Sequence, residues 1–413
     1  MKKKVVVTGM GVISPIGLNV GDFWHGLTHG VSGVDVIQGF DATGYPTTFG
    51  AEVKGFHIED FVTGKEKNRM DTFTQYGVAA AKEALEQADI NTEDVDPYRM
   101  GIIVGSSAGG TNLFVDNYKK LQERGPRRVS PYLTSSMLID ATASEIAMMT
   151  GAKGKSGAFV TACATGNNCV GEGMRAIQWN EADVMIVGGS EGDFSELDLA
   201  AFSRIKALST RNDDPKKASR PFDKDRDGFV LGCGGGILVL ESEEHALQRG
   251  ANILARVSGY GTTSDAYHYT SPDPSCSGMI MAMKLAIEDA GIGPADIDYI
   301  NAHGTSTKLN DHYETIAIKK LFGTYAKDVP VSSIKSMTGH LIGGAGAVEL
   351  IASICALRHG VIPPTINFVE AEPEMDLNYV PNEAQAHQVD TVLTNSFGFG
   401  GHNATLVVRK WEG

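Results

Sequence analysis

The sequence lacks the features of a disulfide-bonded, zinc-stabilised or membrane-spanning chain. Its five cysteines are an odd number and form no C-x-x-C pair, which argues against a disulfide framework and a structural zinc site. No run approaches the ~18 consecutive apolar residues of a membrane helix. The basic start MKKKVVVTGMGVISPIG is interrupted by Gly9, Gly11 and Pro15, unlike a signal peptide. We therefore expect a cytoplasmic protein that contacts no membrane.

The chain is also poor in positive charge. It has 36 Lys and Arg residues against 50 Asp and Glu, a net charge of −14 at pH 7. The phosphates of a nucleic acid would be repelled, so we expect no nucleic-acid partner. The 413 residues are 42% hydrophobic, which is enough for a sizeable core. This length predicts two or three units of roughly 150 residues.

Short β-branched runs alternate with segments of helical period along the chain. This alternation predicts an α/β fold with buried sheets. The predicted strands cover residues 3–10, 100–107, 182–190, 236–242, 297–304, 329–336 and 403–410, and the clearest helices cover 73–90 and 346–360.

One arrangement occurs in both halves of the sequence. ALEQADI at 84–90 is followed by an acidic connection and the strand MGIIVGSS, as AIEDAGI at 286–292 is followed by YINAHGTS. Likewise FVTACATGNNCVGEG and VPVSSIKSMTGHLIGGAGAVE each lead from a strand into a Gly-rich helix start. Chance similarity of ordinary helices is the alternative. We interpret the echoes as duplication of a unit of roughly 200 residues, and predict halves at 1–250 and 251–413 that pack as one body.

Three residues that can carry chemistry follow predicted strands: Cys163, His303 and His340. Ligands of open α/β sheets bind beyond the carboxyl ends of strands, so the three could converge on one site. Cys163 opens a predicted helix, whose dipole would stabilise a thiolate. Lys335 and Glu349 flank His340, and either could orient an imidazole. The alternatives are a small buried cysteine and histidines that only hydrogen-bond within turns.

Seven segments, in order, carry a resemblance to a known family. They are VVVTGMGVISPIG, TACATG, ALSTRNDDPKKASRPFDKDRDGFVLG, DAYHYTSP, NAHGTST, KSMTGHL and NSFGFGGHNA. With these segments the chain resembles the β-ketoacyl-acyl-carrier-protein synthases of the thiolase superfamily, in particular the elongating enzymes of dissociated fatty-acid synthesis. The resemblance implies a thiolase fold, in which duplicated α/β halves pack as a five-layered αβαβα body.

The resemblance also implies a reaction and a set of catalytic residues. Cys163 would hold the acyl group of an acyl-carrier protein as a thioester, and malonyl-carrier protein would lose CO2 and attack it in a Claisen condensation. His303 and His340 would donate to the enolate oxygen, and the amides of Cys163 and Phe399 to the acyl oxygen. The scheme needs no cofactor and no metal, and family members form homodimers.

Further residues are assigned by the same resemblance. Lys335 and Glu349 would support the two histidines, and Phe399 would gate the acyl pocket. Thr305 and Thr307 would bind the pantetheine arm. Gly400 and Ala108 are also predicted to bind substrate, and Ala108 replaces a branched residue of the acyl pocket and should make room for bulkier chains. The predicted carrier-docking residues are Lys65, Arg69, Arg127, Arg128 and Lys206.

The sequence also bears on four other functions. Departures such as Cys233 and Ile334 leave open a dedicated ketosynthase of a dissociated polyketide system. A dinucleotide site at VVVTGMGVIS lacks the third glycine, where Ser14 stands. A degradative thiolase would need a second cysteine near the C-terminus, and none follows Cys355. A non-catalytic partner subunit would lack the nucleophile Cys163.

Overall fold

The two halves of the chain contribute the same strand pattern to one extended sheet. The computed structural model describes residues 2–413. Within them, the sheet has the order β10-β9-β13-β14-β8-β1-β7-β6-β4-β5, which repeats in mirror order from the centre outward. Each half places its first, fifth, fourth, second and third strand in turn, so the duplication is confirmed. The strands are β1 (Val5–Ile13), β4 (Met100–Gly105), β5 (Ser156–Gly157), β6 (Val184–Glu191) and β7 (Gly234–Ser242), then β8 (Ala255–Ser264), β9 (Tyr299–Asn301), β10 (Val331–Ser332), β13 (Thr391–Gly398) and β14 (His402–Arg409).

Strand directions repeat as well. The pairs β1–β7 and β7–β6 are antiparallel, while the pairs β6–β4 and β4–β5 are parallel. In the second half the pairs β8–β14 and β14–β13 are antiparallel, and the pairs β13–β9 and β9–β10 are parallel. Only the first residues of β1 and β8 join the halves, where Val5 to Val7 of β1 pair antiparallel with 255–257.

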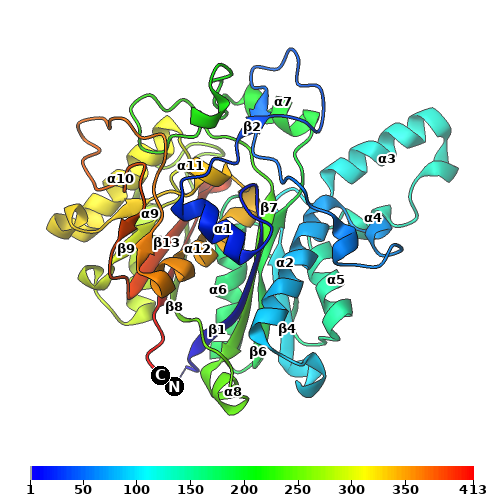
Figure 1. Cartoon of the computed structure of the whole chain (residues 1–413), viewed down its shortest axis with the longest axis horizontal. Helices are drawn as coiled ribbons and strands as arrows, with labels where there is room; N and C mark the ends of the chain where they lie inside the picture. Colours follow the sequence, from blue (N-terminus) through cyan, green and yellow to red (C-terminus); the bar gives the residue numbers. More distant parts are fainter. Residues whose placement is uncertain (1) are drawn as a thin grey trace.

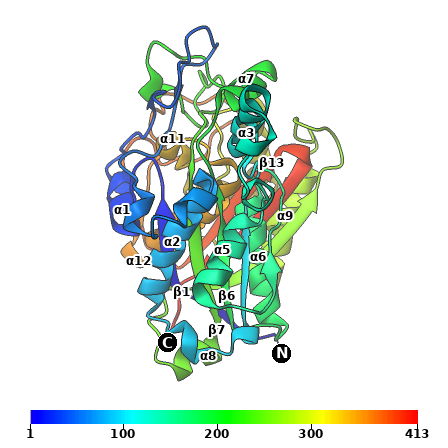
Figure 2. The same cartoon turned by 90° about the vertical axis from the view of Figure 1, so that its right-hand side faces the viewer.

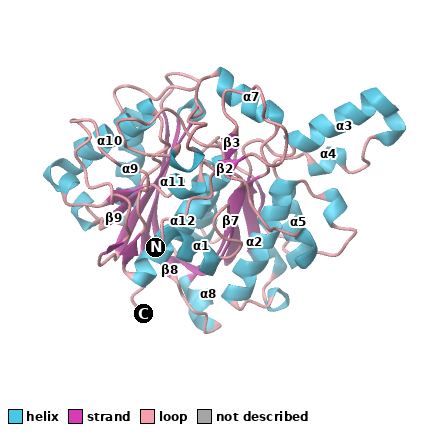
Figure 3. Ribbon diagram, turned by 45° about the horizontal axis from the view of Figure 1, so that its top comes forward, coloured by secondary structure: helices cyan, strands magenta, loops and turns pink. Residues whose placement is uncertain are grey.

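Helices separate and cover the two half-sheets, giving five layers. Two central helices, α6 and α12, lie between the half-sheets and pack on each other (Figure 1). Figure 3 shows α12 between the strands of the two half-sheets. Helices α2 and α5 cover the outer face of the first half-sheet, as Figure 2 shows, and α9 and α10 flank the second. The predicted αβαβα thiolase fold is confirmed. The bounds are α2 (Thr72–Ala88), α5 (Ala141–Thr150), α6 (Thr165–Gln178), α9 (Ser277–Ala290), α10 (Lys308–Phe322) and α12 (Ala345–His359).

Paired glycines let the outer helices approach the sheet closely. A Cβ on Gly9 or Gly11 of β1 would lie 1.9 Å from a carbonyl oxygen of α2. On β8, a Cβ on Gly259 or Gly261 would lie 2.0 or 2.1 Å from a carbonyl oxygen of α9. The N-terminal glycines therefore serve helix packing, which accounts for them without a dinucleotide.

The central helix α12 is apolar on all sides because it is surrounded by protein. The segment Ile342–His359 is long and apolar enough to cross a membrane by composition, yet 83% of that window is buried inside the fold. Such a helix is typical of the core of a large α/β protein. Its one buried carboxylate, Glu349, belongs to the site described below.

The predicted strands and helices are largely present, with three differences. Strands β8 and β13 were not predicted, because glycine and polar residues interrupt their apolar pattern. The predicted strand at 329–336 is shorter, since α11 (Lys335–Thr338) begins inside it. The apolar residues before Cys163 form a loop. The boundary between halves near residue 250 stays a prediction.

The remaining elements lie outside the five layers of this body. Helix α3 projects away from it (Figure 1) and ends in the 3-10 turn Pro126–Arg128. Two short hairpin-like pairs, β2 with β3 and β11 with β12, lie outside the main sheet. These elements are α1 (Val20–Thr28), α3 (Thr111–Arg124), α4 (Leu133–Ser136), α7 (Glu196–Arg204), α8 (Glu243–Gln248), β2 (Asp35–Val36), β3 (Phe49–Gly50), β11 (Val361–Ile362) and β12 (Gln385–Ala386).

Candidate active site

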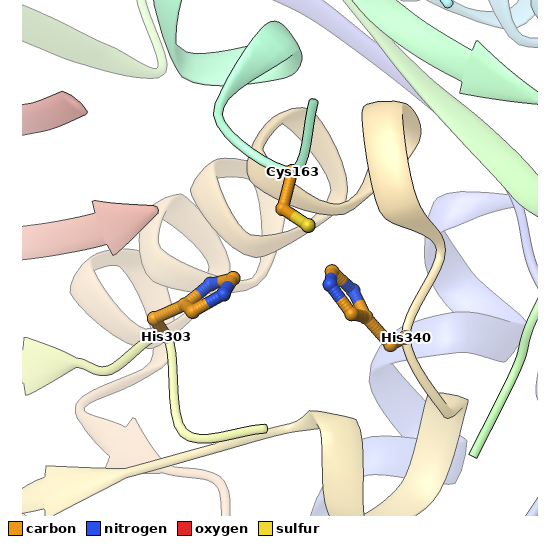
Figure 4. A group of neighbouring side chains, drawn as sticks. All are labelled: Cys163, His303 and His340. Carbon is orange, nitrogen blue, oxygen red and sulfur yellow. The ribbon is translucent and has the colours of Figure 1, made fainter. Parts of the chain in front are cut away.

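Cys163, His303 and His340 meet in the interior, between the two halves (Figure 4). The sulfur of Cys163 and a nitrogen of each ring all lie within 4.8 Å of one another, and the three side chains are buried. The ring centroids are 5.3 Å apart with the planes at 82°, so the rings present their edges rather than stack. The convergence expected from the sequence is therefore present. Such a donor set also suits a soft metal ion.

Cys163 sits on a strained turn just before α6. The preceding residue, Ala162, has φ 49°, a left-handed conformation that residues with a Cβ seldom adopt. The amide of Ala164 donates to the carbonyl of Thr161, and this tight turn points the sulfur away from the helix. Strain of this kind is concentrated at functional sites. The sequence offers no signal for it, since alanine is an unremarkable residue for a helix start.

Burial dominates the acidity of the cysteine. It raises the pKa of the Cys163 thiol to about 11, although the Phe399 amide and the charge of Lys335 act in the opposite direction. Burial thus acts against the thiolate that the sequence led us to expect at a helix start. The helix itself begins at Thr165, two residues after Cys163.

His303 is held by charged partners on both its ring and its backbone. Lys335 donates through Nζ to His303 Nδ1 at 3.3 Å and to the His303 carbonyl at 2.7 Å. The carboxylate of Glu314 accepts the amides of His303 and Gly304 at 2.9 and 2.8 Å. Because Nδ1 accepts a hydrogen bond, the ring proton is assigned to Nε2.

His340 reaches the same tautomer by another route. Its Nδ1 accepts the backbone amide of Ile342 at 3.3 Å, and its buried Nε2 has no partner within residues 2–413. The resemblance implied that Lys335 and Glu349 support both histidines. The structure places Lys335 on His303, while Glu349 contacts Lys335 rather than either ring.

The electrostatic environment keeps both imidazoles neutral. Burial and the charge of Lys335 lower the pKa values of His303 and His340 well below the usual range. The Lys335 ammonium forms a buried ion pair with Glu349, whose pKa burial raises to about 7. Two neutral rings, each with an unengaged N–H, form a site that stabilises a developing anion without carrying a net charge.

A cavity of about 330 Å³ leads to the three side chains. Its wall includes both threonines predicted to bind the pantetheine arm, and Thr305 Oγ1 lies 2.9 Å from Thr307 Oγ1. Phe399 and Lys206 also line it. The cavity is further lined by Ser107, Phe202, Phe229, Lys308, Ile342 and Phe397.

Two predicted substrate-binding residues lie outside the cavity lining, and one predicted docking residue is already paired. Ala108 is exposed and outside the cavity lining, because the loop after β4 turns its neighbour Ser107 inward instead. Gly400 is exposed, and its amide donates to the carbonyl of Tyr269 at 2.7 Å. Arg69 forms a bidentate pair with Glu145 at 2.7 and 2.8 Å, so this guanidinium already has an acidic partner.

The remaining docking candidates are solvent-exposed. Lys65, Arg127, Arg128 and Lys206 form no ion pair with another residue of the described chain. Lys206, with φ 56°, lies at the cavity, whereas Arg127 and Arg128 follow the projecting helix α3. These four therefore remain candidates for contact with an acidic partner.

Fold and site together define a class of protein. A buried cysteine with two neutral imidazoles, located between duplicated α/β halves, is the arrangement of thiol-dependent acyl-transfer enzymes of the thiolase fold. The chain belongs to the β-ketoacyl synthase family: its N-terminal domain matches residues 2–246 and its C-terminal domain matches residues 254–369.

Similar proteins match the chain over its whole length. It is 48% identical over 410 residues to 3-oxoacyl-[acyl-carrier-protein] synthase 2 of Staphylococcus aureus (strain N315), covering 99% of each chain. It is 46% identical over 411 residues to the protein of that name from Synechocystis sp., covering 100% of this chain and 99% of the relative. A solved type II PKS ketosynthase, in complex with its acyl-carrier protein and bound to the hexaketide, superposes with a TM-score of 0.93 at 32% identity and full coverage of both chains.

Proposed function

We propose that this protein is a 3-oxoacyl-[acyl-carrier-protein] synthase that elongates fatty-acyl chains. It would condense acyl-carrier protein with malonyl-carrier protein to give 3-oxoacyl-carrier protein and CO2. The observation that carries the proposal is the pair of neutral Nε2–H donors beside a buried cysteine in one cavity. The full-length similarity to synthases of this name supports the same activity.

The first half-reaction is transfer of the acyl group to Cys163. The sulfur attacks the thioester carbonyl, a C–S bond to Cys163 forms, and the C–S bond to pantetheine breaks. The thiol proton leaves with the pantetheine sulfur. Negative charge on the carbonyl oxygen would be accepted by the backbone amides of Cys163 and Phe399, the latter of which already faces the sulfur.

The second half-reaction uses the two histidines. Malonyl-carrier protein loses CO2 as its C–C bond breaks, and the electron pair forms an enolate whose oxygen accepts both Nε2–H groups. The enolate carbon then attacks the acyl-cysteine, a new C–C bond forms, the C–S bond to Cys163 breaks, and the departing thiolate takes up a proton from solvent. Thiol and imidazole supply every step, so the proposed reaction needs neither a cofactor nor a metal.

Reconstitution with defined carrier substrates tests this function. Purified protein is mixed with acyl-carrier protein, and intact-mass analysis should show one acyl group on Cys163. Addition of malonyl-carrier protein should release CO2 and give a product longer by two carbons. A single extension supports fatty-acid elongation, whereas repeated extension without reduction would show a polyketide ketosynthase. Absence of both loading and condensation would reject the proposal.

We also propose that an acidic carrier protein docks on the exposed cations. Reversing Arg127 and Arg128 to Glu should lower kcat/KM for carrier-bound substrate about tenfold at low salt, because rim charges act mainly on association. The loss should shrink as salt is raised, owing to screening. Turnover of a small acyl thioester should not change.

The matched control for docking is K284E/K320E, which reverses two charges on the outer helices α9 and α10. These variants have the same change in net charge, so a general effect of added negative charge would appear in both. Equal kinetics of R127E/R128E and the parent enzyme with carrier-bound substrate would remove the docking assignment.

We further propose that two copies form a homodimer through the face that carries α3 and the edge strand β5. Helix α3 exposes Phe114, Tyr118 and Leu121 at helical spacing, and Phe159 and Val160 are exposed directly after β5. Exposed apolar side chains grouped beside an unpaired strand edge are typical of an interface. Sedimentation velocity should give a particle of twice the chain mass; a monomer at micromolar concentration would contradict this proposal.

A further inference from the structure

A buried carboxylate outside the Cys-His-His set connects two walls of the cavity. Glu191, the last residue of β6, is 6% exposed. Its Oε1 accepts the hydroxyl of Ser106 at 2.7 Å and the amide of Ala108 at 3.0 Å. Its Oε2 accepts the amide of Ser107 at 2.9 Å and the amide of Gly343 at 3.0 Å. The four donors come from two loops more than two hundred residues apart in sequence.

These donors favour an ionised carboxylate. Three of them are backbone amides, which cannot reverse, so only the hydroxyl of Ser106 could accept a proton from the Glu191 side chain. Burial raises the pKa of Glu191 while these hydrogen bonds lower it, and no lysine, arginine or histidine of the described residues pairs with it. A buried anion retained in this way has a positional role.

One of the two loops sets the tautomer of His340. Ile342, whose amide donates to His340 Nδ1, has φ 46°, which is a genuine outlier for a β-branched residue. A strained residue keeps such a conformation only when its surroundings hold it. The next amide along the chain, that of Gly343, is the one bound by Glu191. The carboxylate therefore holds the strained turn from its C-terminal side.

The other loop is the cavity wall after β4. Ser107 of this loop and Ile342 of the strained turn both line the cavity. The packing between them is tight: a Cβ on Gly343 would lie 2.6 Å from the amide nitrogen of Ser107 and 2.8 Å from Glu191 Oε2. The two walls are thus in direct contact, with Glu191 as the shared hydrogen-bond acceptor.

We propose that Glu191 is a positioning residue, which ties the strained Ile342–Gly343 turn to the Ser107–Ala108 wall and thereby keeps the His340 proton on Nε2, toward the reacting oxygen. The inference rests on the proposed condensing function for its catalytic consequence. Loss of the clamp lets the turn relax, and the Ile342 amide leaves His340 Nδ1. The ring can then place its proton on either nitrogen, and one enolate donor is lost for part of the time.

The test compares E191Q with E83Q. Glu83 on α2 also accepts two backbone amides, those of Val12 and Val20, but lies outside the cavity lining, so E83Q controls for loss of a carboxylate that binds backbone. E191Q should lower kcat for malonyl-carrier decarboxylation about 10- to 100-fold, the range expected when a donor is misplaced. KM should stay within about twofold of the parent value, since Glu191 touches no substrate. E83Q should leave both constants unchanged.

A spectroscopic readout separates positioning from general damage. In protein labelled with nitrogen-15 histidine, the His340 signals, assigned by their absence in H340A, should show one Nε2–H tautomer in the parent and E83Q and a mixture in E191Q. Iodoacetamide should also alkylate Cys163 faster in E191Q, because the charge of Glu191 raises the pKa of that thiol. Neither readout requires carrier substrates.

The outcomes are distinct. An E191Q enzyme with kcat within twofold of the parent and an unchanged His340 tautomer overturns the inference. A parent enzyme that neither loads nor condenses rejects the proposed function, while the tautomer of E191Q still decides the inference. If E191Q does not fold, E191D keeps the charge but is one methylene too short to reach both loops. E191D should then give the same mixture of tautomers, and a single tautomer in E191D counts against the clamp.

Discussion

Replacing Cys163 by alanine should abolish condensation while leaving decarboxylation of malonyl-carrier protein intact. The variant loses the only cysteine that lines the cavity, and with it the proposed acyl carrier, so condensation should fall at least about 10⁴-fold. The two imidazoles and their supports are untouched, so the enolate donors remain. Intact-mass analysis should show no acyl adduct, and a CO2 assay should show continued decarboxylation.

Cys169 supplies the matched control for this prediction. It lies six residues further along the chain, fully buried in α6, and burial raises the pKa of its thiol to about 12. C169A should load and condense at nearly the parent rate, apart from a modest loss of stability. Acyl adducts that persist in C163A, or vanish in C169A, would place the nucleophile elsewhere.

The acidity of Cys163 gives this prediction a pH dependence. With a pKa of about 11, the thiolate fraction rises tenfold for each pH unit between 7 and 9. Alkylation of Cys163 by iodoacetamide should rise with the same slope in the free enzyme. If the alkylation rate has already reached its plateau at pH 7, the pKa of Cys163 lies below 7 and the thiolate is stabilised despite its burial.

Removing either histidine should impair decarboxylation but not acyl loading, the reverse of removing Cys163. H303A and H340A each lose one donor to the enolate oxygen, and decarboxylation should fall about 10²- to 10³-fold. Acyl loading of Cys163 should persist, because the Cys163 and Phe399 amides hold the acyl oxygen. Loss of loading together with decarboxylation in H340A would contradict this division of roles.

His359 is the control for the histidine variants. It lies at the end of α12, stacked on Trp24 with ring centroids 5.2 Å apart and outside the cavity lining, so H359A should leave both half-reactions unchanged. The pH profile gives a second check. Because the pKa values of His303 and His340 are lowered, the rings stay neutral as the pH falls through 6.5. Histidine protonation should therefore cause no loss of decarboxylation by C163A between pH 8 and 6.5, and a loss in this range would belong to Glu349, whose pKa burial raises to about 7.

The sequence predicted the principal parts of the molecule correctly. Repeated helix-strand patterns indicated two α/β halves, and the mirror order of strands around β1 and β8 confirms them. Cysteine and histidine after strand ends indicated a shared site, and the three side chains do meet. These features depend on local periodicity and on motifs, which a linear sequence retains.

Other assignments stay predictions, because they depend on the direction of a side chain. Ala108 and Ser107 are neighbours, and only the hydrogen bonds of their amides to Glu191 decide which of them faces the cavity. Arg69 belongs to a basic cluster in sequence, yet Glu145, 76 residues away, engages it. No pattern within either segment reports such a distant partner.

The sequence by itself determined the α/β class, the duplication, the family and the identity of the three reactive side chains, because hydrophobic period and residue type suffice for these. Tertiary structure alone decided their states: a thiol whose pKa burial raises, neutral rings with the proton on Nε2, and a Glu191 carboxyl held between two loops. Each state follows from burial and from hydrogen bonds across long stretches of chain. Such contacts exist only once the two halves have packed together.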